Sequence, residues 1–141
     1  MRRVYVIGSM KNPNIPKVAS QLRDAGHEAF DDWYAVGPDA DDYWRDYEKA
    51  RGRSYLDALE AWHANHVFRF DREHLNRCNA GVLVLPAGRS AHMELGFLVG
   101  QQKPAFILLD KEQERWDIMY RFATGVVDNV PMLIERLKEW A

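Results

Sequence analysis

A single glutamate in a turn-rich segment is the strongest candidate for chemistry in this sequence. Glu94 lies within residues 86–96, directly after an apolar run at residues 80–85. The pattern predicts a buried strand, a turn of small residues and a helix that carries Glu94 in its first turn. Backbone N–H groups and the positive end of the helix dipole favour an ionised acid there, so we expect a low pKa for Glu94. Such a carboxylate can attack or stabilise an electron-poor carbon, although a glutamate that only improves the helix start explains the spacing as well.

Asp71 offers a second acid ahead of the same apolar run. Two carboxylates beside one reacting carbon can divide the work: one stays charged as a nucleophile, and the other carries a proton to the leaving group. Asp71 also stands at the start of a predicted short helix over residues 71–77. An N-cap is therefore the alternative role of this side chain.

The loop after the first apolar run is a candidate anion site. Residues 3–8 predict a buried strand, and Gly8, Ser9 and Met10 follow at its end. Backbone N–H groups and a hydroxyl in such a loop can face a phosphate. The segment matches no glycine-rich phosphate motif, so a plain tight turn explains it equally well.

Two further loops carry candidate binding residues. The second predicted strand, residues 27–31, ends in Asp31 and leads to Trp33, which could line a pocket for a flat heteroaromatic ring. The alternative for the aromatic residues that follow this strand is the core of a helical insertion.

The turn before the candidate nucleophile consists of Gly88, Arg89 and Ser90. Arg89 could pair with a substrate phosphate, but a solvated arginine is the simpler account. Ser90 could serve only as the cap of the helix.

Strands alternate with helices along the chain, which predicts one domain over residues 1–141 with an α/β, three-layer doubly wound fold of the flavodoxin or Rossmann type. We expect a mainly parallel sheet of four to five strands with a helical insertion after the second. Because the carboxyl ends of parallel strands share one edge, the three loops described above should converge there. The predicted strands are residues 3–8, 27–31, 80–85, 105–109 and a short fifth at 120–124. The predicted helices are residues 15–25, one or two within 40–68 broken near Gly52, 71–77, 90–101 and 130–140.

Composition narrows the function classes. The chain is 47% apolar and 28% charged with a net charge of −2, which is typical of a globular protein and argues against a nucleic-acid partner. No run approaches the roughly 18 apolar residues that span a membrane, and no signal-peptide core is present, so we expect a cytoplasmic protein without a membrane partner. The single Cys78 allows no internal disulfide. His63 and His66 lack metal-ligand spacing, so we predict neither a metal nor another cofactor.

The sequence resembles the nucleoside 2-deoxyribosyltransferases and the related 2′-deoxynucleoside 5′-phosphate N-hydrolases. The similarity covers residues 4–9 and resumes over residues 71–104. Its most specific part is Glu94-Leu-Gly96 after a strand and a turn, followed by Gly100 and Lys103-Pro104.

The resemblance implies roles for the matching residues. Glu94 falls on the family's nucleophile, which attacks the anomeric carbon of the sugar. Asp71 falls on the acid that protonates or orients the base, and Tyr5 on a tyrosine that assists in the N-hydrolases. Gly8 and Ser9 match the loop that receives the 5′-phosphate. The transferases usually carry an Asp in the turn before the glutamate, whereas this chain has Gly88-Arg89-Ser90.

These observations predict an enzyme that cleaves the N-glycosidic bond of a (deoxy)nucleoside or its 5′-monophosphate and releases the base to water. Three alternatives remain open: base exchange between nucleosides, a TIR-like NAD glycohydrolase, and a non-catalytic nucleotide sensor. Because relatives complete their pockets with residues of a neighbouring subunit, the resemblance also implies a homodimer or a higher homo-oligomer.

Overall fold

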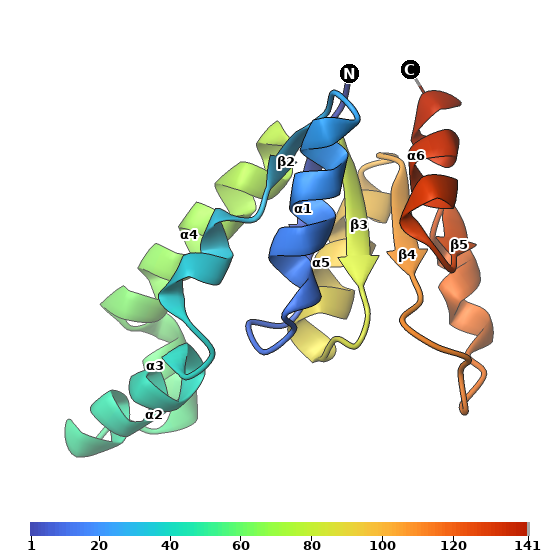
Figure 1. Ribbon diagram of the computed structural model, residues 1–141. Coiled ribbons are helices and arrows are strands. Elements are labelled where there is room, and N and C mark those ends of the chain that lie inside the picture. Colours follow the sequence, from blue (N-terminus) through green and yellow to red (C-terminus); the bar gives the residue numbers. More distant parts are fainter. Residues whose placement is uncertain (141) are drawn as a thin grey trace.

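The computed structural model describes residues 1–140, which fold around a five-stranded sheet in the order β2-β1-β3-β4-β5. All four neighbouring pairs are parallel, so the predicted parallel α/β sheet is confirmed (Figure 1). The strands are β1 (Arg3–Ile7), β2 (Glu28–Phe30), β3 (Ala80–Val84), β4 (Ala105–Leu108) and β5 (Gly125–Val127).

Helices cover both faces of the sheet, which makes the fold doubly wound. One core cluster joins β1, β3 and β4 to the helices α1 and α6, and a second joins the opposite face of these strands to α4 and α5. Along β1, Val4 and Val6 belong to the first cluster, whereas Tyr5 and Ile7 belong to the second. This alternation follows from the two-residue period of a strand. The helices are α1 (Asn14–Asp24), α4 (Trp62–Arg77), α5 (Arg89–Gly100) and α6 (Val130–Lys138).

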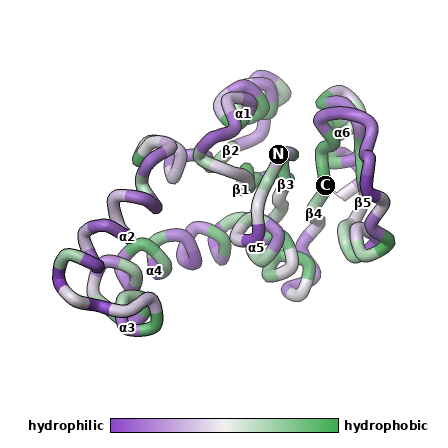
Figure 2. The backbone as a smooth tube through the Cα atoms, turned by 90° about the horizontal axis from the view of Figure 1, so that it is seen from below, coloured by the Kyte–Doolittle hydropathy of each residue, from purple (hydrophilic) through white to green (hydrophobic). Residues whose placement is uncertain are grey.

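The predicted helical insertion after β2 forms an arm that projects beyond the sheet (Figures 1 and 2). The arm contains η1 (Asp32–Val36), α2 (Ala40–Ala50), α3 (Tyr55–Glu60) and the first half of α4. The expected break near Gly52 is confirmed, because Gly52 adopts a φ of 76° directly after α2. Glu48, only 3% exposed, pairs with Arg53 across this turn at 2.9 Å.

Two predicted elements differ from the structure. The expected short helix 71–77 is the second half of α4, because the sequence from Trp62 to Arg77 contains no glycine or proline that would end a helix earlier. The fifth strand is Gly125–Val127 and not residues 120–124. The latter segment belongs to the 3₁₀ helix η2 (Ile118–Phe122), whose start is capped by the Asp117 carboxylate accepting a hydrogen bond from the Met119 N–H.

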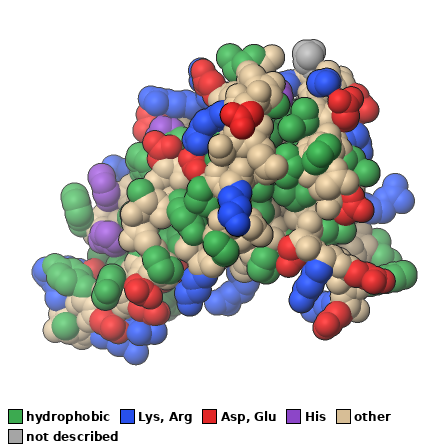
Figure 3. Space-filling model, viewed as in Figure 1, with side chains coloured by type: hydrophobic (Ala, Val, Ile, Leu, Met, Phe, Trp, Pro, Cys, Tyr) green, Lys and Arg blue, Asp and Glu red, His purple; other side chains and the backbone are tan. Residues whose placement is uncertain are grey.

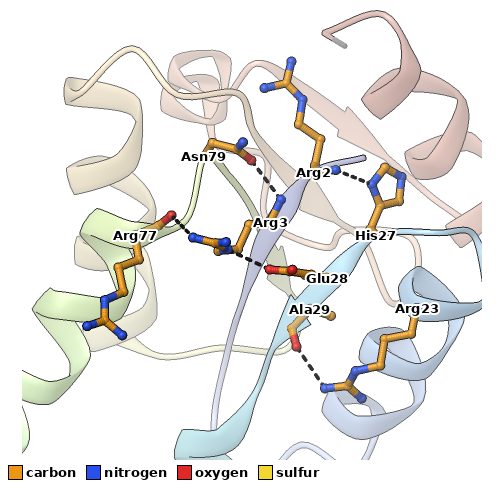
Figure 4. Close-up of polar contacts among 8 residues, drawn as sticks. All are labelled: Arg2, Arg3, Arg23, His27, Glu28, Ala29, Arg77 and Asn79. Atoms are coloured by element: carbon orange, nitrogen blue, oxygen red, sulfur yellow. Dashed lines mark hydrogen bonds and ion pairs between the residues drawn. The ribbon is translucent and has the colours of Figure 1, made fainter.

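The amino ends of the strands are joined by polar contacts (Figure 4). The Arg3 N–H donates to Asn79 Oδ1 at 2.9 Å, and the Arg3 guanidinium pairs with Glu28 at 2.7 Å. These contacts connect the starts of β1, β2 and β3 at the edge opposite to the candidate site. Among residues 1–140, no helix is long and apolar enough to cross a membrane.

Candidate active site

Tyr5 reaches the candidate site from the middle of β1. Its side chain is 1% exposed and faces the layer of α4 and α5, and its ring lies 5.2 Å from the ring of Phe30. The strand period dictates this direction, because both neighbours of Tyr5 point to the opposite face.

The two candidate acids lie on the inward faces of the two helices that cover Tyr5. Glu94 comes three residues after Ala91 and one before Leu95, both buried on α5. Asp71 comes one helical turn before Leu75, the buried residue of α4. Both acids are half-buried. The structure therefore brings together three predicted residues that come from separate elements.

The pKa directions show that the three side chains share one electrostatic environment. Burial, together with the negative charge of Asp71, raises the pKa of Glu94 to about 7, while a hydrogen bond from Tyr5 lowers it. Burial raises the pKa of Asp71 to about 6. Burial and then the charges of Glu94 and Asp71 raise the pKa of Tyr5, so its hydroxyl stays protonated and can donate a hydrogen bond.

The expected low pKa of Glu94 is wrong, for a structural reason. The helix begins at Arg89, so Glu94 lies in the second turn and not in the first. The helix dipole and the free N–H groups act mainly on the first turn. Desolvation between the packed helices dominates instead, and it disfavours the charged form.

The loop after β1 approaches β3 closely at Gly8. A Cβ at this position would lie 2.5 Å from Ile15 Cδ1 and 3.3 Å from the carbonyl oxygen of Val84, so a larger residue would have to displace the Ile15 side chain and crowd β3. Ser9 Oγ accepts a hydrogen bond from the Lys11 N–H at 3.1 Å, which folds the loop on itself. Gly8, Ser9 and Met10 are all half-buried at the carboxyl end of β1.

Asn12 connects this loop to the turn that precedes α5, and the sequence analysis did not identify this residue. The residue is 3% exposed, and its Nδ2 donates to the carbonyl oxygens of Val84 at 3.3 Å and Pro86 at 3.5 Å. Its Oδ1 accepts from the Asn14 N–H at 2.9 Å. An Asn-Pro-Asn sequence is typical of a turn, but nothing in that pattern indicates a bond to a residue more than seventy positions away.

The turn Gly88-Arg89-Ser90 is exposed at the start of α5. Gly88 is the N-cap, and no side chain caps the helix, so the alternative role of Ser90 as the cap is wrong. The first amide groups of α5 consequently have no side-chain acceptor and are available to an anion.

The polar groups of Asp31 and Trp33 bind other parts of the chain. Asp31 pairs with Arg23 at 2.8 Å, and the Trp33 Nε1–H donates to the carbonyl oxygen of Val6 at 2.9 Å. Trp33 also packs against both core clusters. The structure thus places Trp33 beside β1 but keeps its indole N–H occupied, and a role for the ring face in base binding stays a prediction.

Two hollows of the structure are lined by residues other than Tyr5, Asp71 and Glu94. The larger, of about 460 Å³, lies beside β2 and is lined by Phe30, His74 and Cys78 among others, whereas neither Glu94 nor Asp71 lines it. Within residues 1–140, no group of three or more His, Cys, Asp or Glu side chains could hold a metal ion.

Solved structures with the same architecture are available for comparison. A 2-deoxyribosyltransferase of the psychrotolerant bacterium Bacillus psychrosaccharolyticus aligns with 93% of this chain and 89% of its own, at 16% identity and a TM-score of 0.61. A CMP N-glycosidase of Clostridium botulinum aligns with 97% and 99%, at 13% identity and a TM-score of 0.58. The chain has the fold of these proteins.

A conserved protein of Enterococcus faecalis V583 aligns over 100% of this chain and 99% of its own, at 12% identity and a TM-score of 0.66. No family model matches the sequence, and a comparison with curated proteins finds no significant match. The likeness therefore lies in the fold.

Proposed function

We propose that this protein cleaves the N-glycosidic bond of a nucleoside 5′-monophosphate or nucleoside and releases the base to water. The observation that carries the proposal is the convergence of Tyr5, Asp71 and Glu94: the charge of Asp71 raises the pKa of both Tyr5 and Glu94, and Tyr5 forms a hydrogen bond with Glu94. The fold shared with a CMP N-glycosidase and a 2-deoxyribosyltransferase supports the same class of reaction.

In the proposed reaction Glu94 attacks C1′ of the sugar, or stabilises its oxocarbenium-like transition state, on the face opposite to the base. Asp71 gives its proton to the departing base as the C1′–N bond breaks. Water then attacks C1′ and gives a proton back to Asp71 as the bond between C1′ and Glu94 breaks and the sugar is released, which is the logic of a retaining glycosidase. Tyr5 holds the Glu94 carboxylate through its hydroxyl.

The proposed reaction needs a charged Glu94 and a protonated Asp71. In the free protein Glu94 binds the proton more tightly, since the pKa of Glu94 is about 7 and that of Asp71 is about 6. In this proposal, binding of the substrate moves the proton from Glu94 to Asp71. A heteroaromatic base beside Asp71 removes water from it and raises its pKa, because desolvation disfavours a charged carboxylate. As Asp71 takes up the proton, the smaller contribution to the raised pKa of Glu94, repulsion by the Asp71 charge, disappears, and the Tyr5 hydrogen bond favours the Glu94 carboxylate.

The 5′-monophosphate is the preferred substrate in this proposal because two anion-binding elements flank the acids. The Gly8-Ser9-Met10 loop presents backbone at the end of β1, and the start of α5 offers free amide groups together with the exposed guanidinium of Arg89. Both can bind a phosphate.

The test is chromatography of the products after incubation with a panel of nucleosides and their 5′-monophosphates, with NAD as a further substrate. Release of free base by the wild-type protein and its loss in Glu94→Gln support the proposal. Release of nicotinamide alone would instead indicate an NAD glycohydrolase. Binding without any product would indicate a sensor.

Base exchange is the second candidate, because one protein with this fold is a 2-deoxyribosyltransferase. Adding an acceptor base to the same incubation separates the two reactions. A transferase forms a new nucleoside, whereas the proposed hydrolase releases free sugar or sugar phosphate.

We also propose a homodimer or a higher homo-oligomer. Large apolar side chains are exposed on the two helices that carry the acids, among them Phe68 at 58%, Met93 at 76% and Phe97 at 39%. Figure 3 shows hydrophobic side chains scattered among charged ones over the arm as well. A second copy over these helices would cover the open side of the site. Sedimentation of an active protein as a monomer would contradict this proposal.

A further inference from the structure

A histidine next to the candidate nucleophile links the turn before α5 to a distant segment of the chain. His92 Nδ1 lies 2.7 Å from the carbonyl oxygen of Gly88, and His92 Nε2 lies 3.0 Å from the hydroxyl of Tyr120. The rings of His92 and Tyr120 stack at 5.7 Å with an angle of 24°. His92 therefore contacts the turn on one side and η2 on the other.

The carbonyl partner fixes the direction of the first hydrogen bond, and in a neutral imidazole this also sets the direction of the second. A carbonyl oxygen can only accept, so Nδ1 carries a proton and donates it to Gly88. In a neutral imidazole Nε2 then has the lone pair, and the Tyr120 hydroxyl donates to it. The two bonds form one chain from Tyr120 through His92 to Gly88, in which each bond polarises the next.

Tyr120 differs from the other large residues of η2 in its direction. Ile118, Met119 and Phe122 are 74%, 60% and 72% exposed, whereas Tyr120 is half-buried and packs against the second core cluster. Tyr120 is thus the inward anchor of η2, and its hydroxyl meets the helix that carries Glu94.

We propose that His92 and Tyr120 are positioning residues that hold the turn 88–90 in the conformation that receives the sugar phosphate. This inference rests on the proposed function, because it assigns that turn to substrate binding. The carbonyl of Gly88 already accepts the helical N–H of His92 at 3.4 Å, and the imidazole adds a second, shorter bond to the same oxygen. That second bond restricts rotation of the peptide whose other side leads into the first free amide of α5.

Three variants separate the hydrogen bond between His92 and Gly88 from the one between His92 and Tyr120. Tyr120→Phe removes only the hydroxyl. His92→Asn places an amide where Nδ1 was and keeps the Gly88 bond, whereas His92→Gln reaches Tyr120 but gives up Gly88. Tyr43→Phe is the matched control, because Tyr43 is 71% exposed on the arm.

The experiment combines hydrogen exchange of the peptide covering residues 86–92, calorimetric binding of ribose 5-phosphate, and steady-state kinetics with nucleoside 5′-monophosphates. For Tyr120→Phe we expect faster exchange in the turn, about fivefold weaker binding of ribose 5-phosphate and about a fivefold higher KM, the size of one lost neutral hydrogen bond. The kcat should stay within about twofold, since Glu94 and Asp71 are untouched. The changes in exchange, ribose 5-phosphate binding and KM should be larger for His92→Gln than for His92→Asn. Tyr43→Phe should match the wild type in all three.

The outcomes distinguish this inference from the proposed function. A wild-type protein that cleaves no substrate of the panel would refute the function, while exchange and ribose 5-phosphate binding would still decide the role of the link. Unchanged exchange and binding in Tyr120→Phe would overturn the inference. So would faster exchange with unchanged binding and KM, because the link would then be structural only, or a wild-type protein that does not bind ribose 5-phosphate.

Discussion

Replacing Glu94 by glutamine should make the protein more stable at neutral pH while it removes activity. Burial raises the pKa of Glu94 from its usual 4.5 to about 7 in the folded protein. Between these values the unfolded chain has already lost the proton that the folded chain still binds. The free energy of unfolding therefore falls as the pH rises from about 4.5 to about 7, and stays lowered above that.

The size of the effect follows from the shift. Each pKa unit corresponds to about 1.4 kcal/mol, so a shift from 4.5 to about 7 lowers stability by about 3 kcal/mol above neutral pH. Glutamine has the same shape, carries no charge and can still accept a hydrogen bond from Tyr5. Glu94→Gln should thus gain about 3 kcal/mol over the wild type at pH 8 and almost nothing at pH 4, and its turnover should fall about a thousandfold or more.

The assay is denaturant unfolding of both proteins at pH 4, 6 and 8, with turnover measured on the same samples. Glu112→Gln serves as the control, because Glu112 is exposed in a loop and should show no pH-dependent gain. A Glu94→Gln protein that is less stable than the wild type at pH 8 would refute the reasoning. A gain of equal size at pH 4 and pH 8 would also do so, since the charge would then not be its cause.

Three further predictions follow from the site. Asp71→Asn should lower kcat/KM about a hundredfold for nucleotides with ordinary bases but much less for a 7-methylated purine, whose base leaves without a proton. The pH profile of kcat/KM should be bell-shaped with its maximum between about 6 and about 7, where the Asp71–Glu94 pair holds one proton, and a flat profile from pH 5 to 9 would contradict the pairing. Asn12→Ala should lower the free energy of unfolding by about 1–3 kcal/mol, measured in denaturant, because the carbonyls of Val84 and Pro86 lose a buried donor.

Elements with strong local signals could be predicted from the sequence. The apolar run of β3 predicted a buried strand, and the Gly-Ser sequence predicted the end of β1. Together they predicted the edge of the sheet at which the loops after these strands meet. Glu94 and Asp71 could be named as candidates from their positions beside the apolar run, and Tyr5 from the family resemblance alone. The parallel order of the strands predicted that the loops after β1, β2 and β3 meet at one edge, whereas Asp71 and Tyr5 reach Glu94 from α4 and from the middle of β1.

Properties that depend on packing could not be predicted in this way. The pKa of Glu94 is set by how deeply α4 and α5 bury it, and no local pattern reports that depth. The start of α4 was misplaced because the arm continues directly into the helix that carries Asp71. The partners of Asn12 and Tyr120 lie 72 and 28 residues away, beyond the range of any periodicity.

The unbroken course of α4 has a mechanical consequence. The helix runs from Trp62, in the arm, to Arg77, beside the sheet, without a glycine or proline that could act as a hinge. Asp71 therefore sits on a stiff lever whose long end projects into solvent. A force on the arm is therefore transmitted along α4 to the residue that the proposed reaction uses as its proton donor, although the arm lies far from that residue.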